Sequence, residues 1–164
     1  MIINLPEAEK AMFDKLTVSC MDIGFAKKCG EYLLKKGWHS YEWQRRGSVY
    51  FQQSVYTTSL IVSYTRPFTQ TRGLPKIPAE GLDFSPDEQR LHVALKSRRD
   101  TVYAHSDGDS YSFRPWKSGD FATIMEQRPA HIISKDDAEL FVSMAARLVK
   151  TLVARREAIL SIWP

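Results

Sequence analysis

Apolar residues recur every three or four positions over most of the 164 residues, a spacing typical of amphipathic helices. We predict a first helix from Pro6 to about Lys36, because proline suits a helix start and Gly37 a helix end. Its apolar side consists of Phe13, Leu16, Cys20, Ile23, Ala26, Leu33 and Leu34. The lysines lie on its other sides, where they face either solvent or RNA phosphates.

The segment from Trp38 to Thr69 fits strands as well as a buried helix, because β-branched and aromatic residues dominate it. We predict a helix that begins at about Ser40 or Gly47 and ends at Thr65, since Pro67 provides a stop. Its tyrosines are predicted to pack in the core or at its edge. A long loop rich in proline and glycine follows the helix.

A third helix carries the clearest start signal in the chain. Ser85 suits an N-cap, Pro86 suits the first helical position, and Glu88 completes a capping box. We predict that the helix runs on towards Asp107. The residues that follow at steps of four and three are Leu91, Leu95, Arg98, Val102 and His105. An apolar stripe therefore ends in a cation and an imidazole, which is unusual for core positions.

A β-hairpin is predicted next, with strands at Tyr111–Arg114 and Phe121–Glu126 and a turn from Pro115 to Asp120. Ser134, with an aspartate three positions later, begins the last helix. Its apolar stripe is Phe141, Met144, Ala145, Leu148, Leu152 and Ile159, and its other sides carry Arg147, Lys150, Arg155 and Arg156. The predicted fold class is mainly α: an up-and-down bundle of about four main helices with a short β-hairpin before the last, forming one domain over residues 1–164.

Composition narrows the functional classes only slightly. A hydrophobic content of 43% is ordinary for a globular protein, and a net charge of +4 is compatible with an RNA partner without requiring one. Cys20 and Cys29 are roughly 13 Å apart along one predicted helix, beyond disulfide reach. No secretory signal and no membrane-spanning run is visible, so we expect a cytoplasmic protein. No metal-type spacing of cysteine and histidine occurs, and we expect no metal or other cofactor.

The run RRDTVYAHSD, from Arg98 to Asp107, resembles the R-x(4–6)-H motif of the HEPN superfamily, the higher eukaryote and prokaryote nucleotide-binding helical domains. Arg99 and His105 have five residues between them, and Asp100 takes the place of the polar residue that often follows the family arginine. The segment YTRPFT, the proline-rich loop and the ending AHSD are similar to a bacterial branch of that superfamily.

The resemblance implies a helical bundle that dimerises and, in its active members, cuts RNA without a metal. In those members the arginine and histidine of both protomers line a cleft at the dimer interface. Carried onto this chain, His105 would exchange protons with the ribose 2′-hydroxyl or the leaving 5′-oxygen. Arg99 would stabilise charge on the phosphate. Histidine titrates near neutrality, and the planar guanidinium of arginine matches phosphate oxygens.

Helical geometry leaves the choice of arginine open. Six residues along an ideal helix place Arg99 roughly 120° from His105, whereas Arg98 lies within about 20° of it. Arg98 and Asp107 are therefore candidate RNA-binding residues beside the catalytic candidates Arg99, His105 and Asp100. Asp100 and Asp107 either orient the other two groups or are ordinary capping and surface carboxylates. The remaining histidines, His39, His92 and His131, are predicted to be surface or packing residues.

Three functional readings follow from the sequence. The first is a metal-independent endoribonuclease, a homodimer that acts in a toxin–antitoxin or phage-defence system under the control of an antitoxin or another protein partner. The second is a non-catalytic module that binds RNA or a nucleotide, or mediates a protein interaction. The third is a purely structural helical protein, for which RNA affinity should be absent even at low salt.

Overall fold

A computed structural model describes residues 4–103, 111–127 and 129–162. Over these residues the chain is mainly α-helical, with a two-stranded antiparallel hairpin before the last helix, as predicted. The helices are α1 (Glu7–Lys36), α2 (Gly47–Thr65), α3 (Pro86–Arg98) and α4 (Lys135–Ser161), and the strands are β1 (Ser112–Ser118) and β2 (Phe121–Gln127). Short turns lie at η1 (Glu42–Gln44), η2 (Arg66–Phe68) and η3 (Arg99–Tyr103). None of the described helices is long and apolar enough to cross a membrane.

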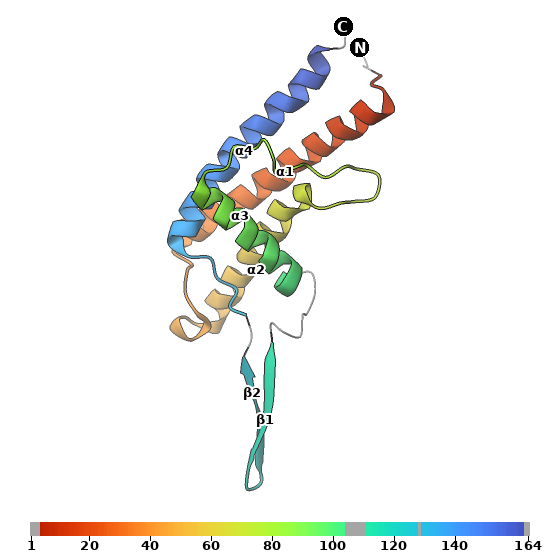
Figure 1. Cartoon of the computed structure of the whole chain (residues 1–164). Helices are drawn as coiled ribbons and strands as arrows, with labels where there is room; N and C mark the ends of the chain where they lie inside the picture. The colour runs from red at the N-terminus through yellow and green to blue at the C-terminus, as the bar shows by residue number, and fades with distance from the viewer. Residues whose placement is uncertain (1–3, 104–110, 128, 163–164) are drawn as a thin grey trace.

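The two longest helices form the frame of the molecule. α1 and α4 lie side by side and run in opposite directions, so the start of α1 and the end of α4 lie near each other (Figure 1). At Gly30 the two helices approach so closely that a Cβ atom would lie 3.0 Å from Cγ2 of Val142. α2 packs against α1, and α3 contacts both α2 and α4. This arrangement brings the end of α3 next to the chain that leads into α4.

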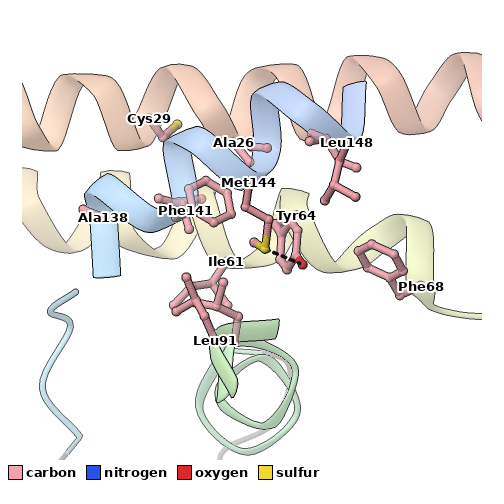
Figure 2. Packing of buried hydrophobic residues seen from close by; sticks show 14 of the residues in the cluster. Ala26, Cys29, Ile61, Tyr64, Phe68, Leu91, Ala138, Phe141, Met144 and Leu148 are labelled. Atoms are coloured by element: carbon pink, nitrogen blue, oxygen red, sulfur yellow. Dashed lines mark hydrogen bonds between the residues drawn. The ribbon is translucent and has the colours of Figure 1, made fainter. Parts of the chain in front are cut away.

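The core lies where the four helices meet (Figure 2). Tyr64 of α2 points towards Met144 of α4, and its hydroxyl lies 3.9 Å from the Met144 sulfur. The predicted stripe of α4 is buried from Phe141 to Leu152. Among the α2 tyrosines, Tyr64 is fully buried, which confirms a packing role for that residue.

Helix ends follow the local sequence signals. The Ser85 side chain accepts a hydrogen bond from the Glu88 N–H at 3.3 Å, and the Glu88 carboxylate accepts one from the Ser85 N–H at 2.8 Å. Ser134 caps α4 through the Asp137 N–H. α1 ends at Gly37, whose φ of 61° is the left-handed conformation that glycine tolerates best. Of the two predicted starts for α2, Gly47 is the one observed.

The hairpin differs from the prediction at its turn. β1 starts at Ser112 and runs on to Ser118, so the turn consists of Gly119 and Asp120 alone. A turn beginning at Pro115 was wrong, because Pro115 pairs with Ile124 inside the ladder. Proline is tolerated there because each strand of a two-stranded ribbon is an edge strand, where a missing N–H costs little. The hairpin projects away from the helices (Figure 1).

Two arginines of α4 are engaged with the rest of the fold rather than simply solvated. Arg147 donates to the Leu82 carbonyl at 2.8 Å and to the Glu88 carboxylate at 2.7 Å. Arg155 donates to the Gly81 carbonyl. These bonds hold the end of the long loop against α4, which positions the start of α3.

Candidate functional site

The third helix changes its winding within the predicted motif. The α-helical part ends at Arg98, and Arg99–Tyr103 forms a π-helical turn. The Thr101 hydroxyl donates to the Ser97 carbonyl at 3.0 Å, and in an α-helix that carbonyl would accept the Thr101 N–H. This competition favours a wider turn, and single π turns are frequent at functional sites. His105 and Asp107 lie outside the described residues.

The π turn invalidates the angles expected for an ideal α-helix. Bonding between residues five apart brings Arg98 and Tyr103 to the same side. Nη2 of Arg98 donates to the Tyr103 hydroxyl at 3.3 Å, and the Arg98 guanidinium carbon lies 5.9 Å from the centre of the Tyr103 ring. Burial raises the pKa of the Tyr103 phenol, so this hydroxyl stays protonated near neutral pH.

Arg98 also binds the chain that leads into α4. Its Nη1 donates to the Ile132 carbonyl at 2.6 Å, and its Nη2 donates to the Ala130 carbonyl at 2.9 Å. Successive carbonyls of an extended segment point in opposite directions, so a planar guanidinium reaches alternate residues. The donors of Arg98 are thus directed at backbone oxygens, and a phosphate would have to displace them.

The opposite side of the same segment is held by α2 and the residues before it. The Gln53 side chain donates to the His131 carbonyl at 3.1 Å, and Nδ1 of His39 lies 3.0 Å from the Ile133 carbonyl, which accepts its proton. The His131 N–H donates to the Tyr50 hydroxyl at 3.0 Å. Residues 130–133 are therefore clamped between the π turn and α2.

Arg98→Ala is expected to lower the free energy of unfolding by about 2 kcal/mol, because the variant removes charge-assisted bonds to two carbonyls and to Tyr103. Urea unfolding measures the change. The neighbouring Arg99→Ala is the matched control, with an expected change within about 0.5 kcal/mol, since Arg99 makes only an exposed ion pair in the described structure. Equal stability of the two variants would contradict a structural role for Arg98.

Arg99 is half-buried and pairs with the adjacent Asp100. Its Nη1 lies 2.7 Å from Oδ1 of Asp100, and the two side chains are 33% and 57% exposed. An exposed ion pair of this kind contributes little to stability, so its groups are available for another partner. The carboxylate orients the guanidinium without burying it. Of the predicted site residues, the structure therefore pairs Arg99 with Asp100, whereas Arg98 binds the backbone of the segment before α4.

A pocket of about 420 Å³ adjoins the π turn through residues 130 and 131. The Tyr103 ring contacts the His131 ring edge-on, with centroids 5.2 Å apart. The pocket is lined by Tyr41, Glu42, Trp43, Gly47, Tyr50, Phe51, Ser54, Pro129, Ala130 and His131. None of these residues was predicted as a site residue. The available signal was the interleaving of aromatic residues with arginines in WHSYEWQRR, before α2.

His92 is a packing histidine, as predicted. It is 2% exposed, stacks on the Phe84 ring with centroids 5.0 Å apart, and its Nδ1 lies 2.7 Å from the Tyr64 hydroxyl. Burial, assisted by the positive charge of Lys96, lowers the pKa of His92 to about 4. The imidazole is therefore neutral at physiological pH and accepts the hydroxyl proton of Tyr64.

The part of the chain that the structure describes contains neither a metal-binding cluster nor a disulfide bond. No three histidine, cysteine, aspartate or glutamate side chains gather there in a way that could hold a metal ion. Cys20 and Cys29 are both free, as their spacing predicted. Burial raises the pKa of both thiols, which disfavours the reactive thiolate form.

Comparison with known proteins adds no further assignment: no family model, no curated protein and no solved structure matches this chain. The relation to the HEPN superfamily therefore rests on the sequence resemblance alone and stays a prediction.

Proposed function

We propose that this chain is a metal-independent endoribonuclease of the HEPN type. The observation that supports this proposal most is that two adjacent arginines have different bonding partners. Arg98 is bound to backbone carbonyls, whereas the partly exposed Arg99 is paired with the adjacent Asp100, six residues before His105. A guanidinium that is not bound to the backbone and is oriented by a carboxylate is suited to a phosphodiester, which it would contact with two parallel donors.

The proposed reaction is an internal transfer at phosphorus. His105 takes the proton of the ribose 2′-hydroxyl, the 2′-oxygen attacks the phosphorus, and the bond to the 5′-oxygen breaks. A second histidine, supplied by another copy of the chain, returns a proton to the leaving oxygen. Arg99 stabilises the charge that develops on the non-bridging oxygens. Asp100 is a positioning residue, because it acts through Arg99.

The exposed hairpin supports a protein partner for this activity. Large apolar side chains are exposed on both of its strands: Phe113, Trp116, Phe121, Ile124 and Met125. An isolated two-stranded hairpin is marginally stable in water, and exposed apolar patches mark interaction sites. We therefore propose that a second copy of the chain, or a regulatory protein such as an antitoxin, covers it.

Incubation of the purified protein with RNA in the presence of EDTA tests the proposal. We expect cleavage products that end in a 2′,3′-cyclic phosphate or a 3′-phosphate. Binding of RNA without cleavage would instead favour a non-catalytic module. Unchanged cleavage by a folded His105→Ala variant would overturn the mechanism.

A further inference from the structure

Exposed aromatic rings line the pocket beside the π turn, and we call Tyr41, Trp43 and Phe51 the platform. The rings of Tyr41 and Trp43 are stacked, with centroids 4.8 Å apart and planes inclined by 9°. Trp43 is 80% exposed and Phe51, on α2, is 67% exposed. Contiguous exposed apolar side chains often mark interaction sites, and aromatic faces bind bases of any sequence by stacking.

The platform is held in place by hydrogen bonds at its base. The Tyr41 N–H donates to the Gln44 side-chain oxygen at 2.8 Å, and the Gln44 N–H donates to the Tyr41 carbonyl at 3.0 Å. Gln53 accepts from the Ser40 N–H and donates to the Ser40 carbonyl, at 3.0 and 2.8 Å. Arg45 donates to the Ser40 hydroxyl. A rigid site loses less conformational entropy on binding than a mobile loop would.

Two arginines, Arg45 and Arg46, lie between the lining residues Trp43 and Gly47, and their charge favours an anionic ligand beside the pocket. Arg45 and Arg46 are exposed on the same turn as the aromatic pair. The α2 helix begins beside them at Gly47, which lines the pocket, and its first turn has no acidic residue and no side-chain cap. The positive end of a helix adds to the charge of the arginines. Glu42 and His131 also line the pocket, and Glu42 is the carboxylate among the lining residues.

We infer that this pocket binds an unpaired nucleobase of single-stranded RNA, next to the phosphate that Arg99 contacts. The inference rests on the proposed function for the identity of the strand. Its connection to the site is structural: Ala130 and His131 line the pocket, while Arg98 binds the Ala130 carbonyl and Tyr103 contacts His131. Stacking between the aromatic rings supplies affinity, and Arg45 and Arg46 contact the flanking phosphates.

Binding of uncleavable 2′-O-methyl RNA to the intact chain tests the inference separately from catalysis. We expect Trp43→Ala to weaken binding of a short single strand roughly tenfold, the loss typical of one stacked base. Phe25→Ala, which removes an exposed aromatic side chain from α1, is the matched control and should bind as the parent does. A strand of the same length whose sugars lack bases should bind weakly and respond little to Trp43→Ala.

The outcomes separate the pocket from the proposed reaction. Equal affinity of Trp43→Ala and the parent, or equal affinity for strands with and without bases, overturns the pocket assignment even if the protein cuts RNA. Base-dependent binding that requires Trp43 supports the pocket even if natural RNA is never cut, in which case the proposed catalysis fails alone. If the parent protein shows neither base-dependent binding nor cleavage, both the pocket assignment and the proposed reaction are overturned.

Discussion

Arg99→Ala is expected to lower the rate of RNA cleavage by about 10²–10³-fold, the loss typical when one donor to a developing negative charge is removed. The variant should keep its fold, because the Arg99 guanidinium is bound only to the adjacent, exposed Asp100 in the described structure. Single-turnover cleavage in EDTA measures the change, and circular dichroism checks the fold. Arg99→Lys should recover only part of the rate, since an ammonium lacks the planar fork.

His105→Ala sets the scale for this comparison, with an expected loss of about 10²–10⁴-fold from the missing proton transfer. Groups that act as a unit are not additive, so Arg99→Ala combined with His105→Ala should be little slower than the slower single variant. Wild-type cleavage by Arg99→Ala, together with loss of cleavage by a folded Arg98→Lys, would reverse the assignment of the two arginines.

Stability of the fold is expected to fall by about 3 kcal/mol as the pH drops from about 6.5 to about 4, through His92 alone. The folded-state pKa of about 4 is lower than the ordinary value because the ring is buried. Between these two pH values the unfolded chain binds a proton that the folded chain does not, so lower pH favours unfolding. The contribution is fully present above about pH 6.5 and lost towards pH 4.

Urea unfolding at a series of pH values measures this effect as a difference between two proteins. His92→Asn keeps an acceptor for the Tyr64 hydroxyl but does not titrate, so its stability should change less steeply with pH over that interval. Its stability at neutral pH should be lower, because the contact with the Phe84 ring is lost. A pH dependence as steep as that of the parent would show that His92 is not the titrating group.

The hydrogen bonds of segment 130–133 contribute to both the fold and the proposed site. Arg98 and Gln53 bind this segment from opposite sides. A loss at either side would move Ala130 and His131, which line the pocket. The segment therefore links the stability of the π turn to the shape of the neighbouring aromatic site.

The starts of α3 and α4, the end of α1 and the fold class could be predicted from the sequence because their causes are local. The caps at Ser85 and Ser134 bond to residues three positions away, and the end of α1 requires only that Gly37 adopt a positive φ. The spacing of apolar residues likewise predicted the buried side of α4. Such interactions depend on neighbours along the chain, so residue types and spacing determine them.

Tertiary structure alone decided what the two arginines of the motif do. The partners of Arg98 at Ala130 and Ile132 are more than thirty residues away, and no periodicity predicts them. The angles between the arginines and His105 were derived from their sequence spacing on an ideal α-helix. The π turn at Arg99–Tyr103 shows that the chain is not α-helical there. The pocket around Trp43 likewise combines three separate segments, which only packing brings together. The sequence by itself determined most of the helix ends, their caps and the motif, whereas long-range contacts decided that Arg98 binds the segment before α4 while Arg99 pairs only with its neighbour Asp100 among the described residues.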